Sequence, residues 1–214
     1  MIFEVKALLF DNDGVLVDSH DTVDKCWDRW AIEFGVKDLV ISEHYGTRAQ
    51  DLVLSLVGEE RFEEANNRIN ELEQESAHLT VALPGAVELL PSIPSDRWTI
   101  CTSANPRLGL ARIQAAGLPV PKHLVTGGDV EQGKPAPDPY LLGAKRLGFD
   151  PKDCIVFEDA QAGVVAGKKA GVKLVIGVSV RALDTEADIV IEDLAGISFD
   201  GFKLFIPEEK ILRR

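Results

Sequence analysis

The sequence predicts an α/β protein with a Rossmann-like parallel sheet covered by helices on both faces, and an all-helical block inserted after the first strand. Short apolar segments alternate with helical patterns from residue 98 onward, which is typical of right-handed βαβ units. The pattern from residue 18 to residue 83 is instead helical. We therefore expect a core domain of residues 1–17 and 84–214 and a helical cap domain of residues 18–83, lying over the carboxyl edge of the sheet.

The core begins with an apolar run at residues 5–10, which predicts a fully buried strand. Further apolar strands are expected at residues 98–102, 123–126, 154–158, 173–178 and 189–191. Helical patterns separate the first four of these strands, at residues 107–116, 139–147 and 162–170. A short helix at residues 86–90 leads from the cap domain back into the alternating pattern.

The inserted block is expected to hold three helices. Ser19 is expected to cap the first, whose apolar residues recur every three or four positions as far as Phe34. A short helix follows a break at residue 46, and a charged amphipathic helix is expected over residues 61–78. The charged tail at residues 208–214 is expected to be peripheral or frayed.

The composition is that of a globular protein with an acidic balance of charges. The net charge of −12 disfavours nucleic acid and anionic membranes as partners, because phosphate backbones require basic patches. No apolar run is long enough to span a membrane, and no signal peptide pattern is present. The three cysteines form no CxxC pair, so we expect reduced, buried thiols in a cytoplasmic protein. A monomer is the default expectation.

Polar residues at the carboxyl ends of the predicted strands carry the functional signal, since ligands bind at this edge of an open α/β sheet. The segments concerned are Asp11 with Asp13, Thr102 with Ser103, and Glu158 with Asp159, joined by Lys134 in a proline-rich loop. Ionised carboxylates at the end of a buried strand repel each other unless a cation or a reaction compensates them. We therefore expect these side chains to converge on one site.

The residue types fit a magnesium-assisted transfer of a phosphoryl group. Asp11, Glu158 and Asp159 would offer the oxygen ligands that Mg²⁺ prefers. The ion and Lys134 would offset the charges of the carboxylates and of a phosphate, so that a carboxylate could attack phosphorus and form an aspartyl-phosphate. Asp13 could protonate the leaving alkoxide and later deprotonate the hydrolytic water.

The loop after the second strand would hold the phosphoryl oxygens. The hydroxyl of Thr102 or Ser103 and loop N–H groups such as that of Ala104 are the expected donors, with Lys134 as the cation. Ser103 is slightly preferred over Thr102. The expected partner of the protein is therefore a small phosphorylated metabolite.

The chain resembles the phosphatases of the haloacid dehalogenase superfamily that carry a helical cap. Their four motifs occur in order: DNDGV from residue 11, TS at 102–103, GKPAPDPYLLGAKRLG from 133, and ED within FEDAQAGVVAGKKAG from 157. The resemblance implies that Asp11 is the nucleophile and Asp13 the acid and base. It also implies a metal ion bound by Asp11, the main-chain carbonyl of Asp13, Asp159, and Glu158 directly or through water.

Within that superfamily, the closest resemblance is to the sugar phosphatase, glycerol-3-phosphatase and 2-deoxyglucose-6-phosphatase branch. It rests on LPGAV at residues 83–87, QGKP at 132–135 and HYGTR at 44–48. The resemblance implies substrate contacts in the cap at Tyr45, Gly46 and Arg48. Glu73 and His78 are weaker candidates for selecting the substrate, because the charged faces of helices are usually solvated. Asn12 is expected to point away from its acidic neighbours.

Two other functions compete with hydrolysis. A mutase resembling β-phosphoglucomutase would share the cap and the motifs, but that enzyme carries a hinge His where this chain has Val23. A non-enzymatic receiver-like module would also use an acidic pocket for Mg²⁺ and phosphorylation. Asp13 argues against it, because a phosphate acceptor without turnover needs no acid or base two residues from the acceptor.

Overall fold

A computed structural model describes residues 1–214, and its centre is a six-stranded sheet in the order β11-β8-β7-β6-β2-β5. Five strands are parallel and one, β11, pairs antiparallel with β8. The strands are β2 (Ala7–Phe10), β5 (Trp98–Ile100), β6 (Cys154–Glu158), β7 (Leu174–Val178), β8 (Ile189–Ile191) and β11 (Ile211–Arg213). The first predicted strand, β2, therefore lies between β5 and β6, with its last residue next to the start of the acidic motif.

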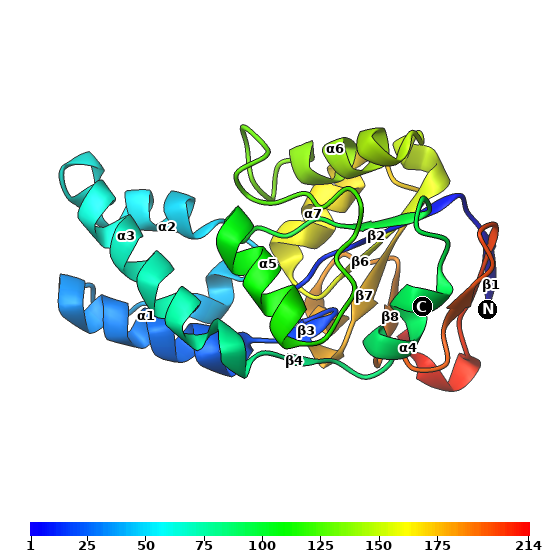
Figure 1. The fold of residues 1–214 in the computed structure, drawn as a ribbon, viewed down its shortest axis with the longest axis horizontal. Helices are drawn as coiled ribbons and strands as arrows, with labels where there is room; N and C mark the ends of the chain where they lie inside the picture. Colours follow the sequence, from blue (N-terminus) through cyan, green and yellow to red (C-terminus); the bar gives the residue numbers. More distant parts are fainter.

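Helices cover both faces of this sheet, as the alternation predicts (Figure 1). The helices are α4 (Ala86–Ser92), α5 (Pro106–Ala115), α6 (Asp138–Leu147) and α7 (Gln161–Ala170). Successive side chains of a strand point to opposite faces. Leu8 and Phe10 accordingly join the apolar cluster that includes α4 and α5, whereas Ala7 and Leu9 join the one that includes α6 and α7. The predicted fold class is confirmed.

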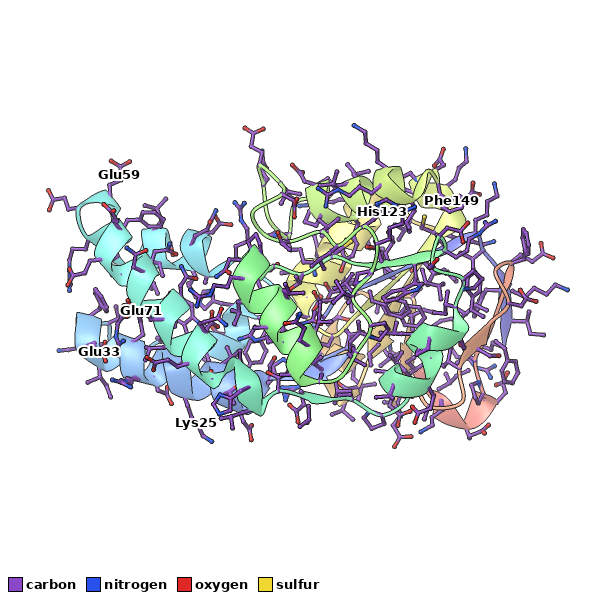
Figure 2. The ribbon with its side chains drawn as sticks, viewed as in Figure 1. Lys25, Glu33, Glu59, Glu71, His123 and Phe149 are labelled. Carbon is purple, nitrogen blue, oxygen red and sulfur yellow. The ribbon has the colours of Figure 1, made fainter.

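The inserted helices lie together at one end of the molecule, away from both termini (Figure 1). They are α1 (His20–Phe34), α2 (Ala49–Val57) and α3 (Glu59–Ser76). Their inner faces form a separate apolar cluster around Trp30, whose indole N–H donates to the carbonyl of Ala65 at 2.8 Å. Glu59 projects outward from the tip of this block (Figure 2). Two short strands connect it to the sheet and pair antiparallel: β3 (Val17–Asp18) and β4 (Val81–Ala82).

A smaller antiparallel sheet of β1 (Ile2–Glu4), β10 (Lys203–Phe205) and β9 (Ser198–Phe199) lies beside the termini. Short 3₁₀ turns complete the chain at Ile41–His44, Ala77–Leu79, Pro151–Asp153, Val180–Asp184 and Glu208–Lys210. None of the helices combines the length and the apolar composition needed to cross a membrane. All three cysteines are free and buried, as predicted.

Two predicted elements differ from the structure. The strand expected at residues 123–126 is reduced to one bridge between Val125 and Cys101. The tail is peripheral, as expected, but it is not frayed, since it supplies the edge strand β11. Arg213 fixes it by donating to three backbone carbonyls, which include that of Thr185 at 2.8 Å.

Candidate active site

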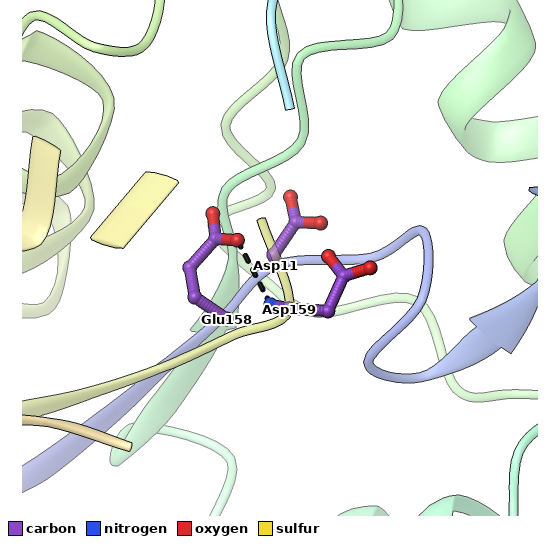
Figure 3. A group of neighbouring side chains, drawn as sticks. All are labelled: Asp11, Glu158 and Asp159. Carbon is purple, nitrogen blue, oxygen red and sulfur yellow. Dashed lines mark hydrogen bonds between the residues drawn. The ribbon is translucent and has the colours of Figure 1, made fainter. Parts of the chain in front are cut away.

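Three carboxylates meet at the carboxyl edge of the sheet (Figure 3). Asp11 follows β2, Glu158 ends the neighbouring parallel strand β6, and Asp159 comes next along the chain. One oxygen of each lies within 4.8 Å of the others, and all three residues are buried. Parallel pairing of β2 with β6 is what brings these distant sequence positions together.

Lys134 neutralises part of this charge. Its side chain is fully buried, and its Nζ donates to Asp11 Oδ1 at 2.5 Å and to Glu158 Oε1 at 2.7 Å. The hydroxyl of Tyr140 on α6 also donates to Glu158 Oε1, at 2.6 Å. Burial raises the pKa of Asp11 well above its usual value, although Lys134 opposes the shift. One lysine is therefore too little positive charge for the three acids.

The donor set suits a hard divalent cation. Asp159 Oδ2 is buried and has no hydrogen-bond partner, although His20 Nε2 lies 3.2 Å away. An orphaned carboxylate oxygen beside two further carboxylates calls for a cation, and oxygen ligands are those that Mg²⁺ prefers. Gly14 leaves the required room: its φ is +84°, and a Cβ there would lie 2.1 Å from Asp159 Oδ2.

Asp13 lies beside this cluster in a different environment. Its carboxylate accepts from Ser19 Oγ at 2.6 Å and from Arg112 Nη1 at 3.1 Å, and its side chain is 23% exposed toward the cavity described below. Desolvation acts to raise its pKa, but Arg112 and the hydroxyl of Ser19 outweigh this, so the pKa of Asp13 is lowered. The surroundings thus favour the ionised form.

Two predictions about its neighbours are wrong. Asn12 does not point away, since it is fully buried and its Nδ2 donates to Asp13 Oδ2 at 3.4 Å. The cause is a tight turn in which the Asn12 carbonyl accepts from Leu16 and Val17. Ser19 occupies the N-cap position of α1, but its hydroxyl bonds Asp13 instead of capping the helix.

The loop after β5 presents two hydroxyls that lie differently. Thr102 is almost fully buried, and its Oγ1 lies 3.5 Å from Asp13 Oδ2 and accepts from the backbone N–H of Ala104 at 3.1 Å. The hydroxyl of Ser103 instead donates to the carbonyl of Gly46 in the helical block, at 2.6 Å. The geometry therefore favours Thr102, not the slightly preferred Ser103, as the hydroxyl next to the acids.

A cavity of about 440 Å³ separates the helical block from this edge of the sheet. Its lining includes Asp11, Asp13 and Asp159 but not Lys134 or Glu158. The wall on the helical side includes the predicted residues Tyr45, Gly46 and Arg48, together with residues for which no role was predicted, among them Asn66, Asn70 and Trp27. The cavity thus connects most of the predicted site residues.

The predicted cap residues have partners within the protein. Tyr45 donates to Asp24 Oδ1 at 2.5 Å, and its ring packs edge-on against His20. Arg48 donates from Nε and Nη2 to Asp51 at 2.7 and 2.9 Å, and its Nη1 donates to the backbone carbonyls of the loop around Val130. In this conformation the guanidinium of Arg48 joins the helical block to the core.

Sequence reasoning missed the role of Arg112 and misjudged Glu73. Arg112, on α5, is buried and lies between Asp13 and Glu73, with Nη2 at 3.5 Å from Glu73 Oε1. Glu73 was expected to be solvated, but it is only 6% exposed, and burial raises its pKa. The available signal was its helical spacing from the apolar residues Ala65 and Ile69, which places it on the buried face of α3. His78 is exposed, as expected.

Comparisons with known proteins agree with this fold. The sequence pattern of the haloacid dehalogenase-like hydrolases matches residues 5–171. Hexitol phosphatase A of Escherichia coli (strain K12) is 39% identical over 203 residues, which cover 90% of this chain and 93% of that protein. Glycerol-1-phosphate phosphohydrolase 2 of Saccharomyces cerevisiae is 31% identical over 216 residues, covering 93% and 86%.

The solved structures extend the similarity to three dimensions. The crystal structure of a hydrolase from Pseudomonas syringae superposes with a TM-score of 0.79 at 27% identity, covering 88% of this chain and 94% of that one. The chain belongs to the haloacid dehalogenase-like hydrolase family.

Proposed function

We propose that this protein is a Mg²⁺-dependent phosphatase that hydrolyses small sugar or polyol phosphates through an aspartyl-phosphate intermediate. One observation carries the proposal: Asp11 lies in a buried cluster with Glu158, Asp159 and Lys134, with the separate carboxylate of Asp13 at its side. One carboxyl group can act as the nucleophile and its neighbour as the general acid and base when their environments differ. The relatives, which are named as a phosphatase and a phosphohydrolase, support the same reaction class.

In the first step, a carboxylate oxygen of Asp11 attacks phosphorus as the bond from phosphorus to the leaving oxygen breaks. The leaving alkoxide takes a proton from Asp13 and departs as an alcohol. A phosphate dianion in the cavity would favour the protonated form of Asp13 at this stage, because like charges repel. Thr102, Ser103, the N–H of Ala104 and Lys134 are proposed to hold the phosphoryl oxygens.

In the second step, a water molecule attacks phosphorus and the acyl-phosphate bond breaks. Asp13, now ionised, removes the proton from that water, and Asp11 is regenerated as orthophosphate forms. The contacts of Asp13 with Arg112 and Ser19 stabilise its carboxylate and so suit it to act as the base here. Both halves of the reaction thus use the same two aspartates.

The acidic cluster is proposed to bind Mg²⁺ through Asp11, Asp159, Glu158 and the main-chain carbonyl of Asp13. When bound, the ion would screen the negative charge that the carboxylates share with the phosphate. Asp159 Oδ2, which is buried and makes no hydrogen bond although His20 Nε2 lies 3.2 Å away, supports this assignment independently of the family relationship.

We further propose that residues 18–83 act as a cap domain over a core of residues 1–17 and 84–214. The separate apolar cluster of α1, α2 and α3 and the two-stranded connection of β3 with β4 support this division. Tyr45, Gly46 and Arg48 would then close the cavity over the substrate, with Arg48 acting through its contacts to the core loop. The free, buried cysteines suit a reducing compartment, so we propose a cytoplasmic location.

The test is phosphate release from a panel of phosphomonoesters with and without Mg²⁺. The panel contains hexitol, hexose and glycerol phosphates, and β-glucose 1-phosphate assayed for both hydrolysis and isomerisation. We expect Mg²⁺-dependent release of orthophosphate from several members without isomerisation. Isomerisation would instead establish a mutase, and inertness toward every member would contradict the proposal.

A further inference from the structure

Arg112 and Glu73 form a charged pair on the wall of the active-site cavity, and the reaction steps above leave Glu73 without a function. Arg112 comes from α5 of the core and Glu73 from α3 of the helical block. Their side chains are 5% and 7% exposed, and both residues line the cavity. They meet only because the helical block sits over the sheet edge.

The pair is incompletely satisfied. Arg112 Nη1 reaches Asp13 Oδ1 at 3.1 Å, but Nη2 lies 3.5 Å from Glu73 Oε1, longer than a good hydrogen bond. Arg112 Nε is buried without any partner. A buried guanidinium N–H without an acceptor costs free energy, so this wall of the cavity favours a further hydrogen-bonding group beside Arg112 and Glu73.

The charges indicate a neutral group. One guanidinium already faces two carboxylates, those of Asp13 and Glu73, so an additional anion would be repelled. A hydroxyl fits, because it can accept from Arg112 while it donates to Glu73. Because Arg112 contacts the proposed acid Asp13, the substrate group that comes nearest is the one next to the leaving oxygen along the carbon chain.

We propose that Arg112 and Glu73 bind the substrate hydroxyl on the carbon adjacent to the phosphoester carbon, an inference that rests on the proposed phosphatase function. The pair makes the enzyme selective for vicinal hydroxyalkyl phosphates, the class that includes polyol phosphates, over simple alkyl phosphates. Arg112 also positions Asp13, so Glu73 is the cleaner residue to perturb.

The test compares kcat/KM for propane-1,2-diol 1-phosphate and propyl phosphate, which differ by one hydroxyl. The wild-type enzyme is expected to prefer the diol phosphate by about 10- to 100-fold, as for a hydrogen bond to a charged group. Glu73→Ala is expected to reduce the preference to about threefold or less, mainly through the diol substrate. Glu73→Gln keeps the side-chain volume, restores part of the preference, and serves if the alanine variant fails to fold.

Glu75→Ala is the matched control, since Glu75 lies on the same helix but is exposed and outside the cavity; the preference should be unchanged. Equal losses on both substrates in Glu73→Ala would assign Glu73 a structural role and overturn the inference. A wild-type enzyme that hydrolyses both esters equally well would overturn it too, but would leave the phosphatase function standing. If the enzyme releases phosphate from neither of these esters and from no phosphomonoester of the panel, both this inference and the phosphatase function are overturned.

Discussion

Replacing Lys134 by Met should destabilise the metal-free protein strongly, because this lysine is the cation bound between two buried carboxylates. Its Nζ donates to Asp11 at 2.5 Å and to Glu158 at 2.7 Å, and neither Lys134 nor Glu158 has an exposed side-chain surface. Methionine nearly matches the lysine stem in volume, so little packing is lost. The substitution instead removes the positive charge that compensates the carboxylates of Asp11 and Glu158.

The expected loss follows from leaving these buried charges unpaired. Removing one partner of a buried ion pair costs about 3–5 kcal/mol, and full burial leaves no solvent to screen the remaining carboxylates. The free energy of unfolding in EDTA should therefore fall by about 3–5 kcal/mol in Lys134→Met. A bound divalent cation compensates the same charges, so the loss should become smaller when Mg²⁺ is present in excess.

The assay is urea unfolding of both proteins, in EDTA and in saturating Mg²⁺. Lys145→Met, an exposed substitution on α6, serves as the control and should change the free energy of unfolding by less than about 0.5 kcal/mol. A loss in EDTA no larger than that of the control would refute the reasoning. So would a loss that Mg²⁺ fails to reduce.

Four further outcomes are expected. Asp11→Asn should lower kcat by at least about 10⁴-fold while keeping the native circular dichroism spectrum, since no nucleophile remains; phosphate release measures this. Asp13→Asn should lower kcat by about 10²- to 10⁴-fold, and a smaller effect in steady-state assays would argue against its acid–base role. Removal of divalent cations with EDTA should abolish phosphate release and added Mg²⁺ should restore it, whereas full activity in EDTA would contradict the metal assignment. Burial raises the pKa of Glu73 above its usual value of 4.5. Just above pH 4.5, the native protein therefore retains a proton that the unfolded chain releases. The free energy of unfolding consequently falls as the pH rises from 4.5 toward the pKa of the native state. Glu73→Gln should show a smaller fall in the free energy of unfolding as the pH rises above 4.5, and a profile parallel to that of the wild type would exclude this cause.

The acidic centre could be predicted from sequence because strand ends in a parallel sheet share one edge. Asp11 follows one buried strand and Glu158 ends another, so their convergence with Asp159 needed only the fold class. Lys134 was predicted on the same grounds, since its loop leads into a helix that covers the sheet. For these residues, the local sequence pattern and the sheet topology both predict a position at the carboxyl edge of the sheet.

The surroundings of Asp13 could not be predicted in this way. Arg112 and Glu73 belong to helices of different blocks, and their meeting depends on how α3 packs over α5. The turn that directs Asn12 toward Asp13 is set by backbone hydrogen bonds that leave no residue pattern. The C-terminal strand was missed for a related reason, since β11 gains its stability from pairing with β8 rather than from its own charged sequence.

The central claim, that the side chain of Asp11 is transiently phosphorylated, can be tested by chemical trapping. The enzyme is mixed with a hydrolysed substrate and Mg²⁺, quenched in acid and treated with borohydride, which reduces an acyl phosphate to the alcohol. Peptide mass spectrometry should then find homoserine at position 11, and only in samples that received substrate. Two results would contradict the account. One is homoserine at the position of another aspartate, and the other is an unmodified residue 11 under conditions in which a phosphorylated intermediate accumulates.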